Sequence, residues 1–284
     1  MKYLLLLIKI IWRIVFKIVI CLSLLLAGTW IYSQTQTPSL DRNRYPEVAK
    51  MPTATFSGDL VTISNIRNTI YRSEDDYDVQ RYDDTFDLTA LDEVRFVVEP
   101  FSDYRGPAHT FVSFGFSGQY ISISVETRKE IGEHYDPIKW LMWAYELTYV
   151  IATEQDVVAL RANHRKDQVY MYPIQTTPEH MRSLFTDMVM TAHELGQTPK
   201  FYNTIYPNCT SAIWSHINKL REDRIPFSWK LILPSYSNEL AYDLWLMANP
   251  NGLSLLQLQS QYYINNRAAT CPEDDSFSTC IRQQ

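Results

Sequence analysis

Glycine is scarce in this chain, with only 8 among 284 residues. No glycine-rich phosphate loop and no dinucleotide-binding fingerprint is present, so nothing indicates a nucleotide cofactor. Acidic residues are absent from positions 1–33, which carry four basic side chains. Since the whole chain has a net charge of −6 and this segment contributes +4, the remainder has −10. An acidic body is poorly suited to phosphate backbones, so we expect no nucleic-acid partner.

Cysteine is also rare, with four in the chain. Cys21 lies in the apolar N-terminal segment, Cys209 stands alone, and Cys271 and Cys280 are close together. None of them is spaced with histidines as zinc ligands are, so we expect no metal and no organic cofactor. If the body lies outside the cytoplasm, as argued next, Cys271 and Cys280 are expected to form a disulfide.

The N-terminal segment predicts a membrane anchor. The run from Ile18 to Tyr32 has no charge, and with residues 14–16 it is long enough to span a bilayer if Lys17 extends to the interface. All positive charge precedes this run, which places the N-terminus in the cytoplasm. No small-residue cleavage site is evident, since Ala27-Gly28-Thr29 is followed by a bulky tryptophan. We therefore favour an uncleaved signal anchor over a cleaved signal peptide.

These features predict the following organisation. Residues 1–33 form a cytoplasmic stub and signal-anchor helix, and 34–49 form a tether. Residues 50–265 form the catalytic body, and 266–284 form a C-terminal tail. The protein would cross the inner (cytoplasmic) membrane once, with its body facing the periplasm or the cell exterior.

Cys209 is the candidate nucleophile. Pro207 cannot lie inside a helix, and Asn208 is a good N-cap, so a helix is expected to begin at Cys209. The unpaired N–H groups and positive dipole end of a helix start stabilise a thiolate. A nucleophilic cysteine also needs a base, usually a histidine from elsewhere in the chain. The competing interpretation is an inert, buried cysteine.

A β-hairpin supplies the candidate base. Residues 109–116 and 119–128 alternate in polarity and are joined by Ser117-Gly118, which indicates a two-residue turn. This register places His109 opposite Glu126, with Arg128 two residues further along. Glu126 would orient His109, and Arg128 would pair with Glu126 or bind an anionic group. The other face is expected to be core and carries Val112, Phe114, Phe116, Ile121, Ile123 and Val125.

The remaining elements follow from periodicity and capping. Residues 136–147 are expected to be helical, and Thr177-Pro178-Glu179 is expected to start another helix. Strands are predicted at 157–162 and 168–174, and helices at 238–247 and 253–263.

Several short motifs together support a family resemblance. They are residues 108–114 (AHTFVSF), 124–130 (SVETRKE), 145–149 (YELTY), 154–156 (EQD) with 160–161 (LR), and 201–204 (FYNT) with 208–210 (NCT). Their order, with the histidine strand before the cysteine helix, resembles circularly permuted papain-like proteins related to NlpC-type hydrolases. More closely, it resembles the Lnb-type lipoprotein intramolecular transacylase family.

This resemblance implies an α+β, circularly permuted papain-like domain in which an antiparallel sheet packs on helices. It implies a cysteine acyltransferase that moves an acyl chain from the diacylglyceryl group of a lipoprotein to its N-terminal amine. Cys209 would carry the acyl group as a thioester, and His109 would transfer the proton. The N–H of Cys209, with Asn208 or Tyr202, would stabilise the oxyanion.

The expected partners are a lipoprotein or lipid acyl substrate and the membrane. Two alternatives remain. A cysteine peptidase or amidase acting on cell-wall or other peptides would use the same three residues, and a non-catalytic, membrane-tethered binding module would keep the fold with an inert Cys209.

Overall fold

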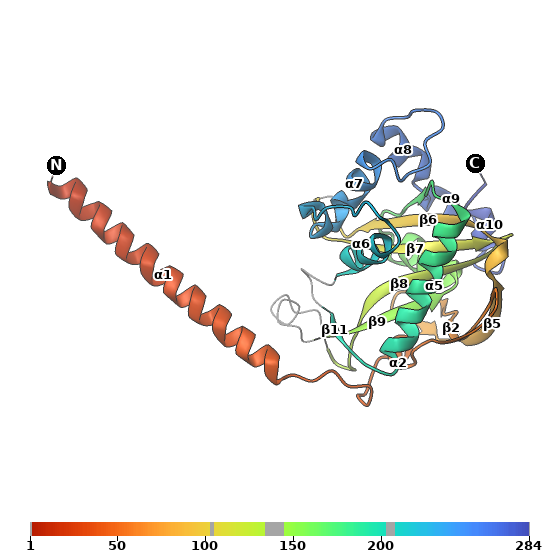
Figure 1. Cartoon of the computed structure of the whole chain (residues 1–284), viewed down its shortest axis with the longest axis horizontal. Coiled ribbons are helices and arrows are strands. Elements are labelled where there is room, and N and C mark those ends of the chain that lie inside the picture. Colours follow the sequence, from red (N-terminus) through yellow and green to blue (C-terminus); the bar gives the residue numbers. More distant parts are fainter. Residues whose placement is uncertain (1, 103–104, 134–144, 203–207, 284) are drawn as a thin grey trace.

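The computed structural model describes residues 2–102, 105–133, 145–202 and 208–283. Within these residues, one nine-stranded sheet forms the centre of the body (Figure 1). Its strand order is β1-β2-β9-β8-β7-β6-β10, with β5 paired to β2 and β11 to β9. The strands are β1 (Thr53–Ser57), β2 (Leu60–Arg67), β5 (Arg81–Asp87), β6 (Leu91–Pro100), β7 (Ala108–Phe116), β8 (Gln119–Arg128), β9 (Tyr145–Ala152), β10 (Tyr170–Pro173) and β11 (Phe201–Tyr202). A separate small hairpin consists of β3 (Ile70–Tyr71) and β4 (Tyr77–Asp78).

Two hydrophobic cores lie on opposite faces of this sheet. The larger core joins the sheet to α5 (Pro178–Leu195), α6 (Cys209–Lys219), α7 (Ser237–Asp243) and α8 (Leu255–Tyr262). The smaller core joins it to α2 (Pro46–Ala49), α4 (Glu154–Ala159), the π-helical turn η2 (Leu160–Arg165), α9 (Asn265–Ala268) and α10 (Phe277–Cys280). Short 3-10 turns are η1 (Leu88–Ala90), η3 (Trp229–Leu231) and η4 (Pro234–Tyr236). This mixed architecture of a sheet packed with helices agrees with the coarse fold prediction.

The predicted hairpin register is confirmed. β7 pairs with β8 from Phe116↔Gln119 to Phe111↔Ser124. Ser117 and Gly118 form the two-residue turn with φ of 49° and 101°, the positive values that hairpin turns require. The predicted core residues of both strands are buried in the larger core.

Two predictions about the elements around the hairpin are wrong. Residues 157–162, predicted as a strand, belong to α4 and η2, which cover the opposite face of the hairpin. The helix forms because Thr153 caps it, accepting a hydrogen bond from the Asp156 N–H. Residues 145–147, expected to end a helix, belong to β9, and the rest of that predicted helix lies largely outside the described residues. The predicted strand at 168–174 and the helix starting at Pro178 are confirmed by β10 and α5.

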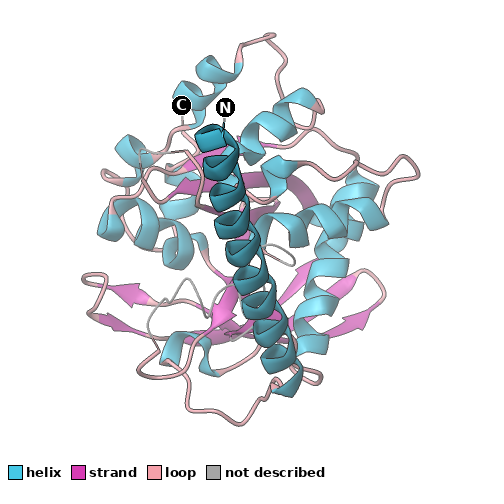
Figure 2. Ribbon diagram, turned by 90° about the vertical axis from the view of Figure 1, so that its left-hand side faces the viewer, coloured by secondary structure: helices cyan, strands magenta, loops and turns pink. Residues whose placement is uncertain are grey.

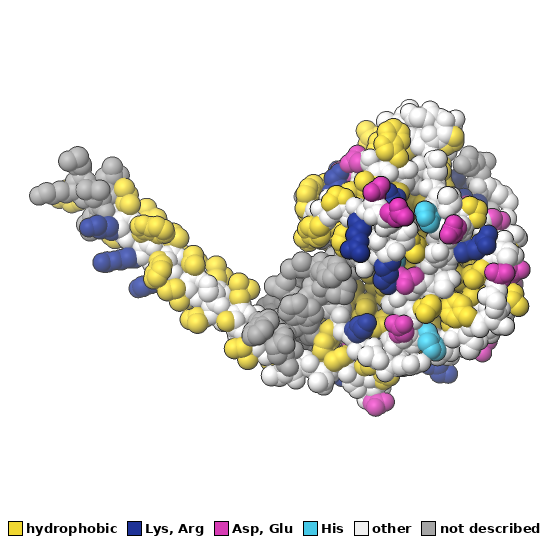
Figure 3. All heavy atoms as spheres, viewed as in Figure 1, with side chains coloured by type: hydrophobic (Ala, Val, Ile, Leu, Met, Phe, Trp, Pro, Cys, Tyr) yellow, Lys and Arg dark blue, Asp and Glu magenta, His cyan; other side chains and the backbone are white. Residues whose placement is uncertain are grey.

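The N-terminal helix α1 (Lys2–Thr35) extends away from the body in Figure 1 and projects toward the viewer in Figure 2. Its segment Ile8–Thr29 has a mean hydropathy of 2.4 and is long enough to cross a membrane. Figure 3 shows that hydrophobic side chains cover most of its visible surface. This agrees with the prediction of one N-terminal apolar helix.

Both segments that flank the predicted catalytic body are packed against it. Arg44 is buried and forms an ion pair with Glu146 at 2.9 Å. Near the C-terminus, the predicted disulfide between Cys271 and Cys280 is confirmed, with a Cα–Cα distance of 5.8 Å. Two residues later, Arg282 forms ion pairs with Glu154 and Glu93. The C-terminal segment therefore holds the first turn of α4.

Candidate functional site

α6 begins at Cys209, as predicted from its N-cap. The Asn208 side chain accepts a hydrogen bond from the Ser211 N–H, and the Ser211 hydroxyl accepts one from the Asn208 N–H. The Asn208 amide also donates to the Leu231 carbonyl at 3.1 Å. Asn208 is therefore engaged in capping the helix, which does not support its predicted role as an oxyanion donor. Pro207, expected to precede the cap, lies outside the described residues.

The Cys209 thiol is buried at the junction of α6 and β7. Its Sγ lies 4.0 Å from the Ala108 carbonyl oxygen and 3.9 Å from the Thr210 hydroxyl. The Thr210 and Thr110 hydroxyls, 2.9 Å apart, tie the helix to the strand. The Cys209 N–H donates to the Tyr202 hydroxyl at 3.2 Å. The backbone N–H of Cys209 and the Tyr202 phenol thus lie together at the helix start, and an oxyanion bound there would replace the hydrogen bond between them.

His109 reaches Glu126 through an intermediate hydroxyl. Its Nε2 lies 2.7 Å from the Ser124 Oγ, which donates to Glu126 Oε1 at 2.8 Å. The direct Nε2–Oε1 distance is 3.9 Å, so Ser124 replaces the predicted direct hydrogen bond. Because the single hydroxyl proton is directed to the carboxylate, the Ser124 oxygen accepts from Nε2–H. This assigns the proton to Nε2 and leaves the lone pair on Nδ1.

Arg161 supports this arrangement from η2. Its guanidinium lies 3.2 Å from Glu126 and 2.6 Å from Glu99. Burial alone would raise the pKa of Glu126, but the charges of Arg161 and Arg67 outweigh burial and lower that pKa to about 2. Glu126 is therefore ionised and can only accept hydrogen bonds.

The same environment sets the charge of two further groups. Burial, assisted by repulsion from Arg161, lowers the pKa of His109 to about 3, so the imidazole is neutral near pH 7. Burial raises the pKa of Glu99 to about 7, although Arg161 opposes this shift. His109 is thus in the neutral form that a general base needs before it takes a proton, although its burial and Arg161 both oppose protonation.

The thiol and the imidazole lie on different faces of β7. Side chains alternate along a strand, and Thr110 contacts α6, whereas His109 stacks on Phe111 and bonds to Ser124. In the described part of the chain, no hydrogen bond joins Cys209 to His109. The sulfur instead contacts the backbone of Ala108, the residue before His109. Direct contact between the two groups requires the imidazole to turn toward the start of β7.

Arg128 has a different role from the one predicted. It donates to the backbone carbonyls of Val48 at 2.9 Å and Ala49 at 2.7 Å. The predicted pairing with Glu126 is wrong, because Arg161 occupies that position. Arg128 instead secures α2 against the sheet.

Sequence reasoning missed Ser124, Arg161 and Glu99. Ser124 could have been found, since it lies two residues before Glu126 on the same strand face. Arg161 could not be placed while its segment was assigned to a strand. In the residues that the structure describes, no group of three or more His, Cys, Asp or Glu side chains is positioned to hold a metal ion.

Comparison with known proteins identifies the family. Residues 78–235, more than half of the chain, match the model of the Lnb N-terminal periplasmic domain. No curated protein and no solved structure matches the chain. The matched range contains His109, Ser124, Glu126, Arg161 and Cys209. Together with the apolar helix α1, a periplasmic domain suggests a membrane-anchored protein that faces the periplasm. The chain belongs to the family of the Lnb N-terminal periplasmic domain.

Proposed function

We propose that this protein is a thiol acyltransferase that moves acyl chains of lipoproteins through a thioester on Cys209. The observation that carries the proposal is the position of the buried thiol at the start of α6, beside its own N–H and the Tyr202 hydroxyl. Such donors stabilise the negative oxygen that forms when a nucleophile attacks an ester carbonyl. Membership of the Lnb family supports the same chemistry.

In the first step, the Cys209 sulfur attacks the ester carbonyl carbon. A C–S bond forms, the C–O bond of the ester breaks, and the leaving alcohol takes the proton that His109 removed from the thiol. For this transfer, Nδ1 of His109 must approach the sulfur. Catalytic hydrogen bonds are often long in a free enzyme and shorten when substrate binds.

In the second step, an amine attacks the thioester. A C–N bond forms and the C–S bond breaks, while His109 takes a proton from the attacking amine and passes it to the leaving thiolate. Ser124 and Glu126 keep the proton on Nε2 throughout, so Nδ1 remains the site of exchange. The ionised Glu126 also stabilises the imidazolium that forms transiently within each step, as the buried aspartate does in serine hydrolases.

The full chain in lipid nanodiscs, incubated with a diacylated lipopeptide, tests the proposal by mass spectrometry. We expect an acyl adduct on Cys209 and an N-acylated product. Cys209→Ala should abolish both, whereas Cys21→Ala, which removes the free cysteine of α1, should retain them. Cleavage of a muropeptide without acyl transfer would support a peptidase or amidase, and no reaction with either substrate would support a binding module.

A further inference from the structure

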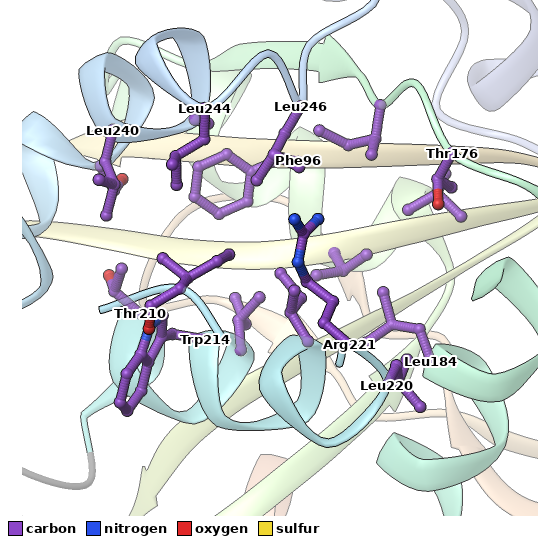
Figure 4. Close-up of a pocket in the computed structure, with 18 of the residues that line it drawn as sticks. Phe96, Thr176, Leu184, Thr210, Trp214, Leu220, Arg221, Leu240, Leu244 and Leu246 are labelled. Carbon is purple, nitrogen blue, oxygen red and sulfur yellow. The ribbon is translucent and has the colours of Figure 1, made fainter. Parts of the chain in front are cut away.

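An apolar cavity of about 120 Å³ lies between α6, α7, β6 and β7 (Figure 4). A cavity needs about 10–15 Å³ to admit one water molecule, so this space holds several non-hydrogen atoms. Most of its lining side chains are aliphatic or aromatic, and apolar cavities take up apolar ligands in preference to water.

The cavity follows the length of α6. The helix lines it with one continuous face, formed by Thr210, Ile213, Trp214, Ile217 and Leu220. From Thr210 to Leu220 this face extends about 15 Å, at about 1.5 Å per residue. Figure 4 shows Thr210, Trp214 and Leu240 at one end of the space, and Leu184, Leu220 and Thr176 at the other.

The two ends of the cavity differ in exposure. Thr210 is buried and is the neighbour of Cys209, whose Sγ lies 3.9 Å from the Thr210 hydroxyl. At the opposite end Thr176, His180 and Arg221 are exposed. The aliphatic stem of Arg221 can line the mouth of the cavity while its charge stays in water. The cavity thus leads from solvent to the residue beside the candidate nucleophile.

This shape suits an unbranched hydrocarbon chain. A polypeptide would have to bury its N–H and C=O groups against walls that offer few polar partners, which is costly. A hydrocarbon chain has no such groups. The segment between α6 and α7 also exposes Phe227 (58%) and Trp229 (53%), side chains suited to a membrane interface. These two residues favour a membrane as the source of the chain.

We propose that this cavity holds the acyl chain that Cys209 accepts, with the carbonyl carbon at Cys209 and the methyl end toward Arg221. The ligand is a long-chain acyl group drawn from a membrane lipid or lipoprotein. This inference rests on the proposed function for its orientation, because the thioester fixes which end of the chain lies at Thr210.

Photo-crosslinking of the Cys209→Ala full chain in lipid nanodiscs tests the cavity without requiring catalysis. The probe is a long-chain fatty acid with a diazirine at mid-chain, and the labelled peptides are mapped by mass spectrometry. We expect labelling of peptides from α6 and from residues 237–246. Leu240→Trp and Leu244→Trp each place an indole in the cavity and should reduce this labelling at least tenfold.

The matched control is Leu256→Trp, the same substitution at a 77% exposed position on α8 outside the cavity lining, which should leave the labelling unchanged. Circular dichroism checks that each variant is folded. If Leu240→Trp does not fold, the labelling of Leu244→Trp alone tests the proposal. Labelling confined to α1, or labelling of α6 that persists in folded cavity-filling variants, would overturn the proposal. Failure of the proposed function looks different: the cavity is labelled, but lipopeptide never acylates Cys209 of the wild-type chain.

Discussion

The Ser124 hydroxyl lies 2.7 Å from Nε2 of His109 and determines which imidazole nitrogen carries the proton. Replacing it by Ser124→Ala should mix the two tautomers, because Glu126 is too distant, at 3.9 Å, to hold Nε2–H alone. The ¹⁵N chemical shifts of the His109 ring report the tautomer directly. We also expect the rate of acyl transfer to fall by about tenfold or more.

Ser122→Ala is the matched control for this experiment. Ser122 is buried on the same face of β8, and its hydroxyl has no hydrogen-bond partner among the described residues. Its removal should leave the His109 tautomer and the rate unchanged. If Ser124→Ala keeps a single Nε2–H tautomer, Ser124 does not position the imidazole.

Arg161→Met should destabilise the body by about 3–5 kcal/mol, because it removes the ion-pair partner of Glu126 and of the fully buried Glu99. Arg105→Met should cost less than about 1 kcal/mol, since Arg105 is exposed and pairs with Glu239, away from Glu99 and Glu126. Chemical denaturation of both variants gives the two free energies of unfolding. If both variants lost the same free energy of unfolding, burial of the Arg161 ion pairs would have no effect on stability.

Because burial raises the pKa of Glu99, the stability of the folded protein should fall as the pH rises toward neutrality. Between its unfolded pKa of about 4.3 and its folded pKa of about 7, the folded state binds a proton that the unfolded state does not. This contribution to stability is complete below pH 4.3 and is lost as the pH rises to 7. Glu99→Gln should therefore flatten the decline in thermal midpoint between pH 5 and pH 7.5. The exposed Glu222→Gln variant should keep the wild-type slope, and an unchanged slope in Glu99→Gln would contradict the assignment.

Loss of the Cys271–Cys280 disulfide should destabilise the body by about 2–3 kcal/mol, the value expected for a short loop. A thermal melt of Cys271→Ser/Cys280→Ser measures this change, with Cys21→Ser as a control that leaves the disulfide intact. The double variant should also weaken the hold of Arg282 on Glu154. Faster hydrogen exchange in α4 would report that effect, and wild-type exchange there would argue against it.

The parts of the site that sequence reasoning placed correctly depend on local signals. The turn at Ser117-Gly118 fixes the register of the hairpin, and Asn208 fixes the start of α6. Both features involve residues within a few positions of each other. The hairpin register and the start of α6 could therefore be predicted without knowledge of distant contacts.

The parts that sequence reasoning missed depend on tertiary structure. The consecutive β-branched residues Val157 and Val158 favour a strand locally, but they are buried in the smaller core on a helix. This placed Arg161 in the wrong kind of element and hid its contacts with Glu99 and Glu126. No local pattern shows that Arg128, which is close to Glu126 in sequence, faces α2 instead.

The alternation of side chains along β7 gives the sheet the role of a partition. On one side lie the thiol and a cavity suited to hydrocarbon, and on the other lie the charges of Glu99, Glu126 and Arg161. One strand thus separates the apolar region beside the thiol from the charged region beside the imidazole. His109 stands at the start of that strand, the point where the two regions adjoin.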